Sequence, residues 1–164
     1  MPAAPLTDEQ IAFIEGGRLI HLAGCDGFLT PSLTPALACR VEPDRQTLTL
    51  VLVRQHAVRL LADIQGNGRL SVLLSQAGKP AQLQLRGRDA RPYAVGAAEL
   101  ASLEAQREAI AAELLPLGFS TGYSYALHRY PDDALAAVQL TVSEWQRPAL
   151  HDQVFYDDGR KTLA

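Results

Sequence analysis

The stretch ALACRVEPDRQTLTLVLV, residues 36–53, decides the fold class of this chain. Aliphatic and β-branched residues fill both halves of the stretch, and Pro43-Asp44 between them is a typical turn pair. Two such runs joined by a short turn predict a β-hairpin. The chain around it is therefore expected to supply further strands of an antiparallel sheet.

Runs of similar character recur on both sides of this hairpin, at residues 18–23, 70–74, 81–88 and 135–142. The turn pair Asp26-Gly27 follows the first of these runs, so the chain should reverse there and return as another strand. Gly78-Lys79-Pro80 joins the second run to the third in the same way. Short connections of this kind predict antiparallel neighbours rather than the parallel strands of a Rossmann fold.

Three helices are predicted between the strands, at about residues 7–15, 57–64 and 99–117. Thr7 and Gln10 have the spacing of a capping box, which begins the first helix. The segment 119–133 fits neither periodicity. About six strands with helices between them predict one domain over residues 1–164, of the α+β or mainly β class. We expect a six-stranded antiparallel barrel, closed or half closed, with flanking helices.

Composition and charge narrow the function classes. The 164 residues are 48% hydrophobic with a net charge of -3, and mixed charges along the chain leave no basic stripe for a nucleic acid. The first 20 residues lack the apolar run of a signal peptide or membrane span, so a cytoplasmic protein with no membrane partner is expected. Two cysteines, Cys25 and Cys39, are too few for a zinc site, and no histidine has the spacing of a metal ligand. Both cysteines are expected to be buried as small hydrophobic residues.

One predicted strand carries polar side chains on a single face. Because side chains alternate along a strand, Gln82, Gln84 and Arg86 lie on one face, and Leu83 and Leu85 on the other. Amide groups donate and accept hydrogen bonds, which suits the mixed edge of a flavin ring. The alternative interpretation is an ordinary solvated face.

Arg54 and Arg59 flank the start of the second predicted helix. Guanidinium groups and the free backbone N–H groups of a helix start can hold a phosphate together. The alternative interpretation is a pair of solvated charges at a helix end.

Motifs in the second half of the chain carry a resemblance to a known family. These motifs are RLSVLLSQ at 69–76 after Asn67, QLQLRG at 82–87, and a tail with Trp145-Gln146, Leu150-His151-Asp152 and Val154-Phe155-Tyr156. Over about residues 10–156 the chain resembles the pyridoxamine 5'-phosphate oxidase-like FMN-binding split barrels, as a diverged member. The resemblance implies a homodimer with its flavin site between the two subunits.

Position by position, the resemblance assigns roles to four residues. Arg59 would contact the FMN phosphate, Gln82 the flavin ring, and Trp145 would form a wall beside the flavin, while His151 would lie on the substrate side. The C-terminal tail, residues 145–164, would thus contribute to the site.

Several departures from the family pattern weaken the expected phosphate contacts. Pro35, Val58 and Leu60 stand where the family has an arginine, a serine and a lysine, and Ala149 and Gln153 replace two arginines of the tail. Residues that would bind the phosphate of the vitamer also lack counterparts. The chain is therefore predicted not to act as a pyridoxamine 5'-phosphate oxidase.

The leading hypothesis is an FMN-dependent oxidoreductase of a small-molecule substrate, in which the flavin carries the hydride and no protein acid or base is required. A deazaflavin in place of FMN stays open. One alternative is a non-catalytic split barrel that binds flavin or haem, and another is a structural barrel with an empty cleft.

Overall fold

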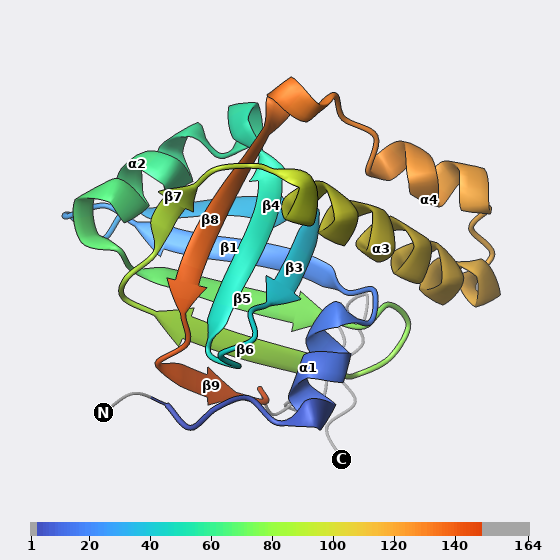
Figure 1. The fold of residues 1–164 in the computed structure, drawn as a ribbon, viewed down its shortest axis with the longest axis horizontal. Coiled ribbons are helices and arrows are strands. Elements are labelled where there is room, and N and C mark those ends of the chain that lie inside the picture. Colours follow the sequence, from blue (N-terminus) through green and yellow to red (C-terminus); the bar gives the residue numbers. More distant parts are fainter. Residues whose placement is uncertain (1–2, 149–164) are drawn as a thin grey trace, which may run out of the picture.

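The computed structural model describes residues 3–148, which form two antiparallel sheets and four α-helices (Figure 1). The five-stranded sheet has the order β2 (Pro31–Ala36), β1 (Leu19–Cys25), β5 (Leu70–Ser75), β6 (Gln82–Gly87) and β9 (Glu144–Gln146). The four-stranded sheet has the order β3 (Ala38–Val41), β4 (Thr47–Val53), β8 (Leu135–Thr141) and β7 (Arg91–Tyr93). The helices are α1 (Asp8–Glu15), α2 (Val58–Asn67), α3 (Ala97–Leu114) and α4 (Thr121–Leu127).

Local sequence signals set the helix ends. The side chain of Thr7 accepts from the backbone N–H of Gln10, and the Gln10 side chain accepts from the N–H of Thr7, which confirms the predicted capping box of α1. Helix α2 ends at Gly68, whose φ of 66° lies in the left-handed region. A side chain there would also press on the carbonyl oxygen of Arg88, so both conformation and space require glycine.

The main core lies between the two sheets. Alternate residues of β1, β4, β5, β6 and β8 point into it, including the fully buried Leu22, Leu50, Val72, Leu85 and Val138. The opposite face of the four-stranded sheet packs against α3, where Val51, Leu103 and Leu135 form a second cluster. Two hydrophobic layers therefore stabilise the four-stranded sheet, one on each face.

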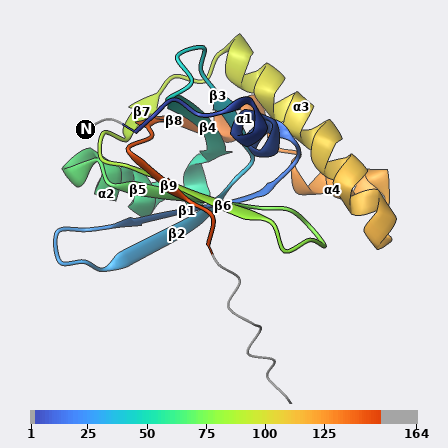
Figure 2. The same ribbon diagram turned by 90° about the horizontal axis from the view of Figure 1, so that it is seen from below.

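No element of residues 3–148 covers the outer face of the five-stranded sheet. Figure 2 shows this sheet on the lower side of the molecule, with α1 and α3 above it. The side chains that point outward include Leu19, 41% exposed, and Leu33, 75% exposed, and the β1–β2 turn adds Phe28, 93% exposed. Apolar residues gathered on one sheet face are typical of a surface that a partner covers.

The structure corrects the predicted strand number and resolves an ambiguous segment. Residues 3–148 contain nine strands rather than about six, and the two that no run predicted, β7 and β9, have three residues each and are too short to show a periodicity. The segment that fitted neither pattern contains α4 and a short 3₁₀ turn.

No helix within residues 3–148 is long and apolar enough to span a bilayer. Cys39 is buried as expected, whereas Cys25 is only half-buried.

Candidate functional site

The predicted polar face of β6 is present. Leu83 and Leu85 are buried in the core, whereas Gln82 and Gln84 are half-buried and Arg86 is exposed on the outer face. This division follows from the two-residue period of a strand with only one face in the core.

The two amides of this face differ in their partners. Gln84 donates from Nε2 to Ser71 Oγ at 2.9 Å and accepts a hydrogen bond from the Gln146 amide. Gln82 makes no side-chain hydrogen bond within residues 3–148, because β9 ends before it reaches that position. Among the described residues, Gln82 is therefore the one of these two amides that is available to contact a ligand.

A pocket of about 530 Å³ opens beside Gln82, between α1, the turn that joins β5 to β6, and residues 147–148. Its volume falls in the range of roughly 300–1,000 Å³ that is usual for small-molecule sites. The side chains that give it its chemistry are Phe13, Arg18, Gln76, Gln82 and Arg147. An aromatic ring, amides and guanidinium groups in one pocket suit a planar ligand with polar edges.

Arg18 is the most unusual residue of this pocket, since its side chain is only 9% exposed. It donates to the carbonyl oxygen of Gly16 at 3.1 Å, contacts Glu113 at 3.4 Å, and lies 4.3 Å from the ring centroid of Phe13. Its Nε has no partner within the described residues. Arg18 lines the pocket and brings a positive charge to it, which Glu113 partly balances.

The sequence analysis missed Arg18. It stands at the first position of a predicted strand, where a polar residue is ordinary. Its burial depends on two residues outside its own strand: Glu113 of α3, which is distant in sequence, and Phe13 of α1. A periodicity taken from the strand alone contains no signal for such a contact.

Arg59 and Arg54 do not form one phosphate site in a single chain. Arg59 is 58% exposed and lies 3.9 Å from the carboxylate of Asp26. The backbone N–H groups of Thr30 and Phe28 donate to that carboxylate and, with the Arg59 charge, hold the pKa of Asp26 below its usual range against a smaller opposing effect of desolvation. Arg54 instead donates to the carbonyl oxygen of Leu135 at 2.8 Å.

Arg59 and Gln82 also lie at opposite ends of the five-stranded sheet. Gln82 pairs with Ser75 of β5, and Ser75 pairs with Leu19, so Gln82 lies level with the start of β1. Asp26, the neighbour of Arg59, directly follows the end of β1. A strand advances about 3.3 Å per residue, so the two ends of β1 are roughly 20 Å apart. One chain therefore does not bring the two predicted flavin contacts into one pocket.

No protein-family model matches the sequence. No curated protein matches it either. Solved structures do share the fold, among them an F420 reductase with a TM-score of 0.56, 12% identity, and coverage of 86% of this chain and 98% of that protein. A Lactobacillus delbrueckii protein, assigned provisionally as a pyridoxamine 5'-phosphate oxidase, has a TM-score of 0.52, 13% identity and coverage of 87% and 93%.

The chain has the split-barrel fold of the pyridoxamine 5'-phosphate oxidase-like proteins. An FMN-binding protein of Syntrophomonas wolfei also matches, with a TM-score of 0.50, 14% identity, and coverage of 86% of this chain and 84% of that one. The resemblance that the motifs indicated is thus confirmed for the fold.

In this split barrel, Trp145 does not share the polar face of β6. The register places Trp145 opposite Leu85 and Gln146 opposite Gln84, and directly opposite residues lie on the same face of a sheet. Trp145 nevertheless lies beside Gln84 and Arg86 at a small hollow of about 50 Å³, and its predicted place beside the flavin stays a prediction. His151, Ala149 and Gln153 lie outside the described residues, so their predicted roles stay predictions.

Histidine, cysteine and carboxylate groups form no metal-binding cluster of three or more within residues 3–148. The ligand chemistry of the described split barrel is instead that of amide, guanidinium and aromatic groups.

Proposed function

We propose that this split barrel binds FMN and acts as an oxidoreductase on a small-molecule substrate. The observation that carries the proposal is the pocket of about 530 Å³, which Gln82 and the positively charged Arg18 both line. Gln82 is also the residue that the family resemblance assigns to the flavin ring. The F420 reductase and the FMN-binding protein with the same fold support a flavin-type ligand.

The residues of the pocket match the polar edge and the apolar face of such a ring. The Gln82 amide can donate to a ring carbonyl and accept from a ring N–H. The Arg18 guanidinium places a fixed positive charge in a nearly buried position, which favours negative charge on a neighbouring ring. The flavin would supply the hydride chemistry, and the protein would bind it, orient it and limit the access of water.

A homodimer is part of this proposal. Exposed Leu19 and Leu33 on the outer face of the five-stranded sheet are apolar groups that a second copy would remove from water. A site shared by two copies would also explain why Arg59 and Gln82 lie at opposite ends of one chain. Arg59 of one protomer would then contribute to the flavin bound beside Gln82 of its partner.

The test is a titration of the purified protein with FMN, riboflavin, a deazaflavin and haem, followed by absorbance and fluorescence. We expect saturable FMN binding that weakens in Arg18→Gln and Gln82→Ala, and an unchanged affinity in Arg129→Gln, which removes an exposed charge elsewhere. Haem binding without flavin binding would support the binding-protein alternative. No binding of any flavin would refute the proposal.

Measurement of redox turnover distinguishes an enzyme from a protein that only binds flavin. Reduced nicotinamide cofactors and dithionite should bleach the bound flavin, and small oxidants should restore its colour at a rate that the free flavin does not reach. Pyridoxamine 5'-phosphate should not be oxidised, because the family's substrate-phosphate residues have no counterparts here. Efficient production of pyridoxal 5'-phosphate would contradict that part of the proposal.

A further inference from the structure

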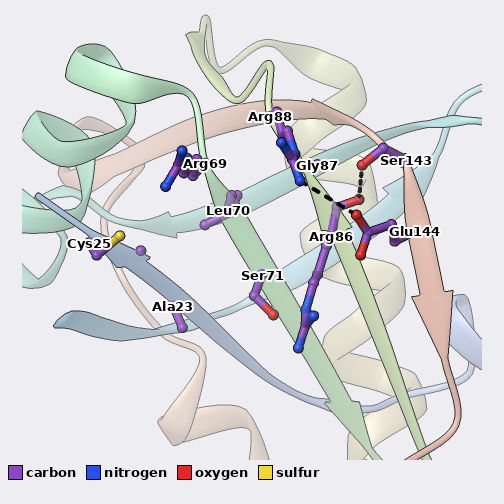
Figure 3. Close-up of a pocket in the computed structure, with 11 residues that line it drawn as sticks. Ala23, Cys25, Arg69, Leu70, Ser71, Arg86, Gly87, Arg88, Ser143 and Glu144 are labelled. Atoms are coloured by element: carbon purple, nitrogen blue, oxygen red, sulfur yellow. Dashed lines mark hydrogen bonds and ion pairs between the residues drawn. The ribbon is translucent and has the colours of Figure 1, made fainter. Parts of the chain in front are cut away.

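A second pocket, of about 310 Å³, lies at the other end of the five-stranded sheet (Figure 3). It is formed by the end of β1, the start of β5, the end of β6 and the start of β9. We call it the arginine pocket, because its lining includes Arg69, Arg86 and Arg88. It shares none of its lining residues with the pocket beside Gln82.

Positive charge in the arginine pocket is only partly balanced. The pocket has three arginines and one carboxylate, that of Glu144. Its Oε1 lies 3.8 Å from Nη2 of Arg88, which is longer than a hydrogen bond. Neither Arg69 nor Arg86 forms an ion pair or a side-chain hydrogen bond with the described part of the chain. Two guanidinium groups therefore have free donors in a protein whose net charge is -3.

These arginines line one small pocket. A volume of 310 Å³ is that of a sphere about 8 Å across, a distance over which charges still interact at physiological ionic strength. Figure 3 shows Arg86 extending toward Ser71, while Arg69 and Arg88 lie at the other end of the pocket. Like charges at this spacing repel one another, and an anion between them would remove that repulsion.

Ser71 adds a neutral donor to the arginine pocket. Its Oγ accepts a hydrogen bond from the Gln84 amide at 2.9 Å, and its own hydroxyl hydrogen has no acceptor among residues 3–148. That hydrogen can therefore point to a bound anion. The same bond links the pocket to the amide face of β6.

We propose that the arginine pocket binds the phosphate group of a small ligand. A phosphate presents several strong acceptor oxygens and up to two negative charges, which match the free donors of Arg86 and Ser71, while Arg69 adds positive charge at the other end of the pocket. A pocket of this volume holds a phosphate with a few attached carbon atoms rather than a whole nucleotide. The phosphate would come either from FMN itself or from a separate phosphorylated substrate.

The first experiment measures inorganic phosphate binding by isothermal titration calorimetry, with no flavin present. We expect one saturable site per chain whose affinity falls about tenfold or more in Arg86→Gln and in Arg69→Gln, since a charge-assisted contact contributes roughly this factor. The control is Arg129→Gln, which removes the same charge from an exposed position outside the pocket. Because Arg86 and Arg69 are exposed, their variants should unfold at the same temperature as the wild type.

The second experiment identifies the source of the phosphate by comparing FMN with riboflavin. If the FMN phosphate occupies the pocket, Arg86→Gln weakens FMN binding and not riboflavin binding, and inorganic phosphate competes with FMN. If a separate ligand supplies the phosphate, neither Arg86→Gln nor inorganic phosphate changes the affinity for FMN. Both outcomes support the phosphate site.

The inference on the arginine pocket would be overturned by equal phosphate affinities in the wild type, Arg86→Gln, Arg69→Gln and Arg129→Gln. The absence of any saturable phosphate binding would overturn it as well. A failure of the flavin proposal gives a different result, because phosphate binding through Arg86 would then persist while FMN and riboflavin both fail to bind.

Discussion

The outer faces of the two sheets differ in what covers them. On the four-stranded sheet, Val51 and Leu135 point outward from β4 and β8 and are at most 1% exposed, because α3 lies over them. On the five-stranded sheet, Leu33 points outward from β2 and is 75% exposed. Within residues 3–148, α3 covers the outer face of the four-stranded sheet, and no helix covers the outer face of the five-stranded sheet.

Under the proposed homodimer, the covered face would serve stability and the open face would serve association. The central strand β4, TLTLVLV, is buried on both of its faces, and the polar side chains Thr49 and Gln139 of the four-stranded sheet are buried as a hydrogen-bonded pair. The open face also carries a hydrogen-bonded polar pair, Ser71 and Gln84, but both of these side chains are only half-buried. Apolar side chains mixed with half-buried polar ones are typical of interfaces and ligand sites.

The largest effect is expected on the covered face. Leu103→Ala removes a 4% exposed side chain that packs between α3 and the four-stranded sheet. Large-to-small changes of this kind cost about 2–4 kcal/mol in the free energy of unfolding, which a urea titration measures. The matched control, Leu115→Ala, changes a residue that is 57% exposed and should cost no more than about 0.5 kcal/mol. Equal losses for both variants would contradict the assignment of the second hydrophobic cluster.

On the open face, the expected effect is on association rather than folding. Leu33→Glu should weaken the proposed homodimer by about tenfold to a hundredfold in Kd, because it places a charge in a surface that two copies bury. Light scattering over a range of concentrations measures the shift from dimer to monomer. The unfolding free energy of the monomer should stay within about 0.5 kcal/mol of the wild type. A wild-type protein that stays monomeric at micromolar concentration would remove the homodimer from the proposal.

Much of the fold could be predicted from local signals. The capping box of Thr7 and Gln10, the Pro43-Asp44 turn and the glycine at the end of α2 each act within a few residues, so the sequence shows them directly. The strands β7 and β9 could not be predicted, because three residues contain too little of a two-residue period. Their positions are set by pairing with β8 and β6.

The candidate site was predictable only where it depends on one strand. The period of β6 was enough to place Gln82 and Gln84 on one face. The difference between the two amides depends on Ser71 and Gln146, which come from neighbouring strands. The same holds for Trp145, whose face is fixed by the register of β9 against β6 and not by its own segment.

The two amides allow a sharper test of the open face. Gln82→Ala should weaken FMN and riboflavin binding alike, by roughly tenfold, because a free amide that contacts the ring is lost. Gln84→Ala should change either affinity by less than about threefold, since that amide already bonds within the protein. Fluorescence titration with both flavins measures the four values. A larger loss of flavin affinity in Gln84→Ala than in Gln82→Ala would show that the ring binds beside Gln84 and not in the pocket beside Gln82.

The smallest expected effect concerns Asp26, at the far end of the same face. Its lowered pKa keeps the Asp26 carboxylate ionised at any pH near neutrality, so a negative charge stays 3.9 Å from Arg59. That charge opposes a phosphate which approaches Arg59. Asp26→Asn removes the charge and can keep the turn, because a single oxygen, Oδ1, accepts from both Phe28 and Thr30 and an asparagine retains that oxygen.

If Arg59 holds the FMN phosphate, Asp26→Asn should tighten FMN binding by roughly two- to fivefold, as expected for an exposed charge, and leave riboflavin binding unchanged. The gain in FMN affinity should disappear in the double variant Asp26→Asn/Arg59→Ala, because the Arg59 cation that Asp26 neutralises is then absent. Arg59→Ala alone should weaken FMN binding more than Arg54→Ala, whose guanidinium is already bonded to Leu135. An unchanged FMN affinity in Asp26→Asn and in Arg59→Ala would exclude Arg59 from the flavin site and leave the arginine pocket as the place for that phosphate.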